Sequence, residues 1–295
     1  MNKLSLLLHD RTLNTENPCF IMGIVNANNN SFWKESRFTG KKAANQALKM
    51  IEDGADIIDI GAESSRPGAT YISDVEEIKH LIPVIKEIRK HSNIPISVDT
   101  RKSTVMKACF EEGANILNDI SALEDDENLG DFVAKANIPV ILMHKQGNPT
   151  TMQNNPNYTD IVIEVSHYLA KRCKYAISKG INPEKIILDP GIGFGKNLNH
   201  NKKLILGSST ILQNVQNRLE YDNEIKSCSS VPIHMVMALS RKTCIGELTS
   251  KPVKERLAGT LAANLIAIEN GATILRVHDV KETKDILSVY RGLYD

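Results

Sequence analysis

Short, fully apolar segments alternate with amphipathic segments along most of the chain. In Lys185–Asn197, three branched apolar residues, Ile186–Leu188, are followed at once by Asp189 and a loop with three glycines. A run without polar positions is typical of a strand buried on both faces, as in a parallel sheet. By contrast, Lys41–Asp53 has apolar residues at positions 43, 44, 47, 48 and 51, the spacing of one helix face. The pattern therefore predicts strands that alternate with helices.

The same alternation continues on both sides of these segments. Strands are predicted at Phe20–Val25, Asp56–Ile60, Ile96–Val98, Ile116–Leu117, Val140–Met143, Ile186–Leu188, Ile233–Leu239 and Ile274–Leu275. Helices are predicted at Lys41–Asp53, Asp74–Lys90, Ser103–Glu112, Leu129–Ala136, Thr159–Ser178, Leu204–Leu219, Pro252–Asn270 and Lys281–Leu293. Ser103 is expected to cap its helix, and Pro252–Asn270 to be strongly amphipathic. Residues 3–19 are interpreted as an amino-terminal strand or hairpin, and the polar residues 217–230 as a surface insertion.

A weak internal repeat supports a barrel. The segments EDGAD (52–56), EEGAN (111–115) and ENGAT (269–273) each join a helix to a strand. In each, Gly is expected to end the helix and Ala to enter the next strand. Eight strands alternating with helices favour a (β/α)8 TIM barrel over an open doubly wound sheet, and no Gly-rich dinucleotide motif follows the first strand. We expect a single domain over residues 1–295: a (β/α)8 TIM barrel with an amino-terminal strand or hairpin.

Composition narrows the class of partner. The chain is 41% apolar and 24% charged, with a net charge of +1 and no concentrated Lys/Arg stripe, which argues against a nucleic-acid partner. No apolar run approaches the length of a membrane span, and Leu4–Leu8 is too short for a signal peptide. The five scattered cysteines lack metal-ligand spacing and are interpreted as reduced thiols of a cytoplasmic protein.

Polar residues follow the predicted strands at the points where the apolar runs stop: Asn26, Glu63, Asp99, Asn118, His144, Asp189, Lys242 and His278. In a (β/α)8 barrel these ends share one face, and that face holds the active site. A carboxylate directly after a buried strand is costly to bury without donors. We therefore expect Asp189 to meet donors of a bound molecule. The alternative is that Asp189 caps the next helix.

Most of these strand-end residues, together with Arg276 near the last of them, form two chemical groups. The first supplies acceptors, an amide and a cation for a flat heterocycle with several N–H donors: Asp99, Asn118, Asp189 and Lys242. The second suits an anion, phosphate above all: Asn26, Arg276 and His278. Asn26 could also offer an oxygen to Mg²⁺, which usually shares its ligands with phosphates. The residues alone thus predict a barrel that binds a polar heterocycle beside a phosphate.

At this point the chain resembles dihydropteroate synthase over nearly its whole length. The matching segments are MGIVN (22–26), ESSRPGA (63–69), SVDTRK (97–102), LNDISAL (117–123), LMHKQGNPTTMQ (142–153), LDPGIGFGKN (188–197), SRKTCIG (240–246) and RVHDVKET (276–283). Their order and spacing make the resemblance specific. It implies a transferase that joins 6-hydroxymethyl-7,8-dihydropterin diphosphate to 4-aminobenzoate, giving 7,8-dihydropteroate and diphosphate in folate biosynthesis.

The resemblance also implies a role for each residue of the site. The pterin would be bound by Asp99, Asn118, Asp189 and Lys242, with Met143 packed on its ring. The diphosphate would be held by Asn26, Arg276 and His278, with Asn26 on Mg²⁺ as the cofactor. The 4-aminobenzoate would meet Ser65, Arg66, Pro67, Phe194 and Thr243. The catalytic set would comprise Asn26, Asp99, Asp189, Lys242, Arg276 and His278. The resemblance further implies a cytoplasmic homodimer and a target of sulfonamides.

The first loop departs from the family pattern. The family usually reads N-V-T-P-D-S-F after the first strand, whereas this chain reads Asn-Ala-Asn-Asn-Asn-Ser-Phe over 26–32. Asn30 therefore replaces an acid, which leaves open a pterin-binding barrel with weak or lost synthase activity. Two other classes are weighed: a pterin-dependent methyltransferase domain, which would usually need a cobalamin partner domain, and an aldolase-type barrel, for which Lys242 is the only placed Schiff-base candidate.

Overall fold

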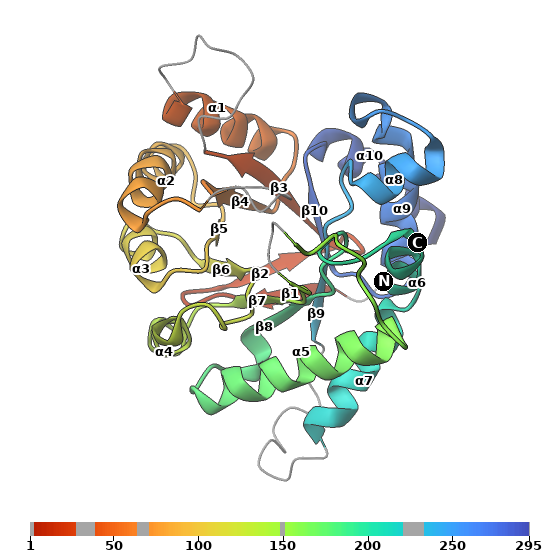
Figure 1. The fold of residues 1–295 in the computed structure, drawn as a ribbon. Coiled ribbons are helices and arrows are strands. Elements are labelled where there is room, and N and C mark those ends of the chain that lie inside the picture. Colours follow the sequence, from red (N-terminus) through yellow and green to blue (C-terminus); the bar gives the residue numbers. More distant parts are fainter. Residues whose placement is uncertain (1–2, 28–38, 64–70, 148–150, 221–232, 295) are drawn as a thin grey trace.

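The computed structural model describes residues 3–27, 39–63, 71–147, 151–220 and 233–294. Within them the predicted barrel is confirmed: parallel strands close on themselves in the order β10-β3-β4-β5-β6-β7-β8-β9 (Figure 1). The strands are β3 (Phe20–Asn26), β4 (Ile57–Gly61), β5 (Ile96–Asp99), β6 (Ile116–Asp119), β7 (Val140–Met143), β8 (Ile186–Asp189), β9 (His234–Met237) and β10 (Ile274–Val277).

Helices surround the barrel, as the alternating pattern predicts (Figure 1). They are α1 (Thr39–Glu52), α2 (Asp74–Arg89), α3 (Ser103–Glu111), α4 (Glu127–Ala136), α5 (Ile161–Ser178), α6 (Leu198–Leu206), α7 (Ser208–Glu220), α8 (Thr243–Thr249), α9 (Leu257–Glu269) and α10 (Val280–Tyr294), with short 3₁₀ turns η1 (Pro183–Lys185) and η3 (Val253–Glu255). None of the helices in the described ranges is long and apolar enough to cross a membrane.

The amino terminus is a hairpin, which resolves the choice between strand and hairpin. Strands β1 (Leu4–Leu7) and β2 (Thr12–Thr15) pair antiparallel. Leu6 and Leu8 pack against residues at the amino-terminal ends of the barrel strands: Phe20, Met22, Ile57, Ile116, Ile141, Ile187, Val236 and Ile274. Because that end of the barrel would otherwise expose an apolar interior to water, the hairpin closes it. The opposite end stays polar and is the end that carries the candidate site.

The repeated pentapeptides end their helices as predicted. Gly54, Gly113 and Gly271 have φ values of 99°, 101° and 94°, in the left-handed region that favours glycine. The following alanine donates its N–H back to the last turn each time, as Ala55 does to the Met50 carbonyl at 2.9 Å. The alanines do not yet belong to the strands, which begin two residues later. These turns fix where each strand enters the barrel.

Three helix predictions need correction. Ser103 does not cap α3: it is the first helical residue, Lys102 precedes it as the N-cap residue, and the Ser103 N–H donates to Asp126 at 2.7 Å. The segment predicted as one helix near Leu204–Leu219 is divided at Gly207 into α6 and α7, where α5 packs so closely that a Cβ on Gly207 would lie 3.0 Å from a Val162 methyl.

The third correction concerns α9. It starts at Leu257, after the η3 turn, and it is not strongly amphipathic, because Thr260 and Asn264 lie on its buried side while Ile266 is exposed. The predicted insertion at 217–230 falls partly on α7, and its remainder lies outside the described residues.

Candidate active site

The barrel register places the predicted site residues side by side. Asn26 on β3 pairs with Gly61 on β4, Gly61 pairs with Asp99 on β5, and Asp99 pairs with Asn118 on β6. A Cβ at Gly61 would lie 3.2 Å from the Asp99 Cβ, so glycine leaves room for that carboxylate. On the next two strands, Met143 pairs with Asp189. The carboxyl ends of β3 to β8 therefore form one continuous rim.

Strand alternation turns several of these side chains into the barrel. Successive residues point to opposite faces, so a residue two positions after an inward-facing one also faces inward. The apolar floor contains Ile57, Ile116, Ile141, Ile187 and Ile274. Two positions further along the same strands come Asp59, Asn118, Met143, Asp189 and Arg276. One largely polar layer thus lies directly above an apolar one, within the barrel.

Arg276 holds two carboxylates in this layer. Its Nε donates to Asp59 at 2.7 Å, and one of its terminal nitrogens lies 2.6 Å from Asp59 and 3.0 Å from Asp99. The Asn118 side-chain amide lies 3.3 Å from both Asp59 oxygens. Burial opposes the charge of Arg276, but the two carboxylates outweigh it and raise the pKa of the guanidinium. Arg276, which was predicted to bind phosphate, therefore lies among residues predicted to bind the pterin, Asp99 and Asn118.

Asp59 is a site residue that the sequence reasoning missed. It is fully buried in β4, inside the apolar run IIDIG. The sequence did contain a signal for Asp59, because a carboxylate inside a buried strand is costly without hydrogen-bond donors. The same reasoning was applied to Asp189. The strand-end rule passed over it, since Asp59 lies two residues before the end of its strand.

Asp99 and Asp59 both contact the Arg276 guanidinium. Burial raises the pKa of Asp99 to about 7, although Arg276 favours the ionised form. One guanidinium serves two acids, the fully buried Asp59 and the partly buried Asp99, and two of its three short contacts go to Asp59. Asp99 is consequently a carboxyl group that can gain or lose a proton near neutral pH.

Asp189 at the end of β8 and Lys242, the N-cap residue of α8, interact electrostatically. Asp189 Oδ1 accepts the Gly191 N–H at 2.7 Å, and burial raises the pKa of the carboxyl. Burial lowers the pKa of Lys242 to about 8, against the opposite pull of Asp189. The Lys242 ammonium donates to the Ile192 carbonyl and lies 4.7 Å from the centre of the Phe194 ring. Asp189 thus receives a donor from its own loop and does not cap a helix.

The glycine loop after β8 packs against the segment after β7. Gly191, Gly193 and Gly195 all have positive φ, and a Cβ on Gly191 would overlap the His144 carbonyl. Glycine at this position therefore allows the loop to pack directly against the protein's own backbone. Lys196 completes the contact: its ammonium lies 3.0 Å from His144 Nδ1 and donates to the Phe194 carbonyl at 2.9 Å.

Lys196 was not singled out from the sequence. It is buried, and burial lowers its pKa well below that of an ordinary lysine, against the pull of Asp189. Burial also lowers the pKa of His144 to about 2, so its ring is neutral and Nδ1 can accept a hydrogen bond. His144 was placed at a strand end, and the structure pairs it with this lysine. Lys196 thereby links the His144 ring to the backbone of Phe194.

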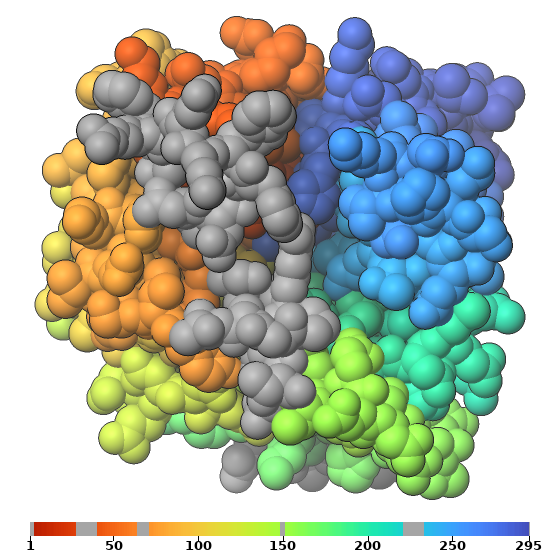
Figure 2. Space-filling view, turned by 45° about the horizontal axis from the view of Figure 1, so that its top comes forward, coloured from red at the N-terminus to blue at the C-terminus, as the bar shows by residue number. Residues whose placement is uncertain are grey.

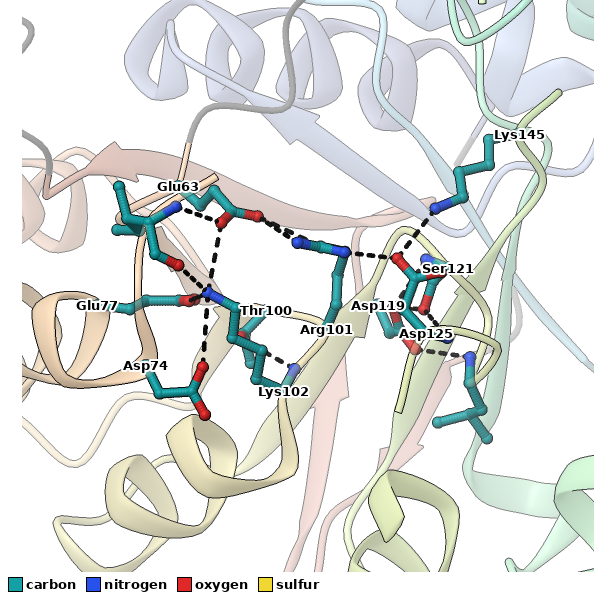
Figure 3. A network of polar contacts seen from close by, with 12 residues as sticks. Glu63, Asp74, Glu77, Thr100, Arg101, Lys102, Asp119, Ser121, Asp125 and Lys145 are labelled. Carbon is teal, nitrogen blue, oxygen red and sulfur yellow. Dashed lines mark hydrogen bonds and ion pairs between the residues drawn. The ribbon is translucent and has the colours of Figure 1, made fainter. Parts of the chain in front are cut away.

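The remaining predicted residues lie around the rim. Asn26 is exposed at the end of β3, which neighbours β10. His278 follows β10, and its Nδ1 lies 2.9 Å from the Ser240 hydroxyl. Thr243 is the first residue of α8 and is exposed. Glu63 bonds to Arg101 and Lys102 instead of facing the barrel interior (Figure 3). Ser65, Arg66, Pro67 and the Asn-rich first loop lie outside the described residues.

Comparison with known proteins defines the class first. Residues 22–278 match the family described as "Pterin binding enzyme". The fold and the polar strand ends are thus those of a pterin-binding barrel enzyme. The dihydropteroate synthase of Haemophilus influenzae is 41% identical over 273 residues, 92% of this chain and 93% of that protein. That of Escherichia coli is 38% identical over 287 residues, 97% of this chain and 95% of that protein.

Solved structures agree with these relatives. The Xanthomonas albilineans dihydropteroate synthase with 4-aminobenzoic acid is 36% identical, with a TM-score of 0.87 over 99% of each chain. The Yersinia pestis enzyme in a sulfonamide drug complex is 32% identical, with a TM-score of 0.87 over 99% of each chain. The chain belongs to the dihydropteroate synthase family and is therefore a transferase. Nothing in these comparisons favours a barrel that binds a pterin without synthase activity.

Proposed function

We propose that this chain joins 6-hydroxymethyl-7,8-dihydropterin diphosphate to 4-aminobenzoate and releases diphosphate. Different residues at the rim bind the pterin, the diphosphate and the 4-aminobenzoate. The observation that carries this assignment is the layer of Asp59, Asn118, Asp189 and Arg276 above the apolar floor, with Asp99 beside it. Buried acceptors of this kind suit a ring that offers several N–H donors. The Arg276 guanidinium in the same layer suits the negative charge of the diphosphate leaving group.

The pterin binds to Asp99, Asn118, Asp189 and Lys242, with Met143 against its ring. Met143 is buried at the end of β7, opposite Asp189. When ring N–H groups bind to the Asp99 carboxylate, they compete with Arg276 for it. Because Arg276 keeps two contacts to Asp59, it stays oriented while its third contact is released. Pterin binding thereby frees one guanidinium N–H group for the diphosphate.

Asn26, Arg276 and His278 hold the diphosphate. They come from the adjacent strands β3 and β10, whose carboxyl ends meet at the rim. Asn26 fits Mg²⁺ as a single oxygen ligand, because its side chain is exposed at the strand end and this ion would usually share its protein ligands with phosphates. When bound, the ion neutralises charge on the phosphates. Arg276 and His278 stabilise the charge that develops on the leaving diphosphate as the pterin C–O bond breaks.

The 4-aminobenzoate lies between Phe194 and the start of α8. Lys196 binds the Phe194 carbonyl, and the Phe194 ring lies 4.7 Å from the Lys242 ammonium, so an aromatic ring can pack beside it. Thr243 offers a hydroxyl to the carboxylate, and Ser65, Arg66 and Pro67 complete this end of the site. The amine then forms the new C–N bond with the pterin methylene carbon and gives up a proton to solvent. The chain's residues bind and orient, and no covalent enzyme intermediate forms.

A homodimer, a cytoplasmic location and a single domain over residues 1–295 belong to the same proposal. Helices α6, α8 and α9 pack together and expose apolar side chains, Leu206, Leu248 and Ile266. Apolar side chains on neighbouring helices suit a self-complementary interface between two copies. Light scattering after size exclusion should give twice the chain mass, and Ile266→Asp should lower it towards one chain mass.

The test of the residue roles compares two ligands. His278→Ala should weaken the diphosphate-bearing pterin at least tenfold and the pterin without diphosphate less than twofold, because His278 belongs to the anion group only. Calorimetric titration in the presence of Mg²⁺ measures both. Lys145→Ala, which removes a cation that contacts Asp125 away from the barrel interior, serves as the control. Equal losses for both ligands would make His278 structural, and absent diphosphate release by the wild type would refute the function.

A further inference from the structure

Asp59 is a buried acid of the polar layer, and no substrate group is assigned to it. It lies on β4 and contacts Arg276 on β10, the two strands that flank β3 in the barrel order. The helices that follow these two strands, α2 and α10, lie on the left and at the upper right of Figure 2. Closure of the barrel therefore brings the two side chains together from distant parts of the chain.

Asp59 is closed off from a molecule that enters the barrel. Its side chain is 0% exposed, whereas those of Asp99 and Arg276 are 15% and 21% exposed. Asp59 Oδ2 accepts the Arg276 Nε–H at 2.7 Å, and the Asn118 amide nitrogen lies 3.3 Å from both Asp59 oxygens. Because no part of its side chain reaches the surface of the site, Asp59 can act on a substrate only through these neighbours.

Arg276 lies between two acids that compete for its guanidinium. One terminal nitrogen lies 2.6 Å from Asp59 and 3.0 Å from Asp99. A guanidinium is planar and can turn an edge with two N–H donors toward one carboxylate. In this structure the edge formed by Nε and that terminal nitrogen faces Asp59, so Asp99 receives a single contact. The charge of Asp59 therefore decides how much of the Asp99 carboxylate Arg276 occupies.

We propose that Asp59 is a positioning residue for pterin binding, because it keeps the Arg276 guanidinium from closing on Asp99. Asp99 then offers its carboxylate to the N–H groups of the pterin ring, while Arg276 stays available to the diphosphate. This inference rests on the proposed function, which assigns Asp99 to the pterin and Arg276 to the diphosphate. Asp59 touches neither group, so its whole effect on the pterin passes through Arg276.

Two variants and a control separate this role from a general loss of structure. Asp59→Asn keeps the shape of the side chain and removes its charge, so Arg276 turns to Asp99 and opposes the ring. Asp59→Asn/Arg276→Met removes both charges, so no guanidinium competes for Asp99 and neither member of the pair is left buried without its partner. Asp56→Asn is the matched control, the same exchange three positions earlier, before the first residue of β4, where Asp56 accepts the Ile21 N–H at 2.8 Å.

Calorimetric titration with 6-hydroxymethyl-7,8-dihydropterin, without diphosphate and without Mg²⁺, is the main experiment. Each protein is compared at the highest affinity that it reaches between about pH 5 and pH 9. Asp59→Asn should bind the pterin about tenfold more weakly than the wild type, whereas the double variant and Asp56→Asn should stay within about threefold of it.

Two results would overturn the proposal. One is an Asp59→Asn affinity equal to that of the wild type. The other is a double variant about tenfold weaker than the wild type, because Asp59 would then act on the pterin without Arg276. The second comparison holds even if the single variant does not fold, since the double variant leaves no charge of the pair unpaired.

The pH at which pterin affinity falls is a second readout, and a loss of packing would not move it. Burial raises the pKa of Asp99 to about 7, Arg276 opposes this rise, and Asp59, Glu77 and Asp119 add to it. Affinity is therefore present above that pH and lost below it as Asp99 gains a proton. In Asp59→Asn the fall should move to lower pH, because one raising charge is gone and Arg276 contacts Asp99 more fully. In the double variant it should move to higher pH, because Arg276 acts on Asp99 more strongly than Asp59 does.

An unmoved fall in Asp59→Asn would also overturn the proposal, since Arg276 would then not have turned to Asp99. A wild type that binds the pterin and releases no diphosphate from the complete substrates would refute the proposed function alone. The pterin titrations of the variants would still decide whether Asp59 positions Arg276.

Discussion

The pair of Asp59 and Arg276 should be a measurable source of stability. Asp59 is fully buried, Arg276 is 21% exposed, and two of the three short contacts of the guanidinium go to Asp59. Asp59→Asn keeps the size of the side chain and removes its charge. Breaking a buried ion pair by removing one partner costs roughly 3–5 kcal/mol. Because Arg276 keeps Asp99, we expect the lower end, about 3 kcal/mol of unfolding free energy.

Urea unfolding at pH 8 measures this cost. The wild type, Asp59→Asn, Arg276→Met and the double variant form a double-mutant cycle, which should give a coupling free energy of about 2 kcal/mol. Asp279→Asn is the matched control, because Asp279 also makes two contacts with one arginine, Arg241, but that arginine lies nearer the surface with 29% exposed. Its cost should be about 1 kcal/mol or less. A coupling below about 0.5 kcal/mol for Asp59 and Arg276 would refute the reasoning.

Three further outcomes test the site. Asp189→Ala should weaken pterin binding by roughly 2–5 kcal/mol in calorimetry, because it removes buried charged acceptors; unchanged affinity would contradict its assignment. Affinity for the diphosphate substrate should decline above about pH 8 as Lys242, with a pKa of about 8, loses its proton, and also below about pH 7 as Asp99, with a pKa of about 7, gains one; Lys242→Arg should abolish only the decline above pH 8, and a persistent decline there would exclude Lys242 as its cause. Asn30→Asp should raise turnover about tenfold, equivalent to about 1.4 kcal/mol, because it restores the acid that the family pattern has at this position, and a carboxylate would stabilise a developing pterin cation; lower or equal turnover would contradict this.

The sequence alone determined the architecture and the ring of polar strand ends. Apolar runs without polar positions are typical of strands buried on both faces, and eight such runs alternating with helices favoured the barrel. The three glycines of the pentapeptide repeat also ended their helices as predicted, because only a residue without Cβ adopts that conformation at little cost. Both kinds of signal are local: each depends on residues that lie within a few positions of one another.

The tertiary structure alone decided which charges meet. Arg276 and Asp59 are 217 positions apart, Arg101 and Glu63 are 38 apart, and Lys196 and His144 are 52 apart. Such pairings follow from barrel closure and from strand register, which bring the strands and the residues that follow their carboxyl ends together whatever their distance along the chain. Polar side chains can be recognised in a sequence one at a time. Their partners depend on how far along the barrel axis each side chain lies, which only the closed barrel determines. For that reason Arg276, predicted for phosphate, lies with Asp59 and Asp99.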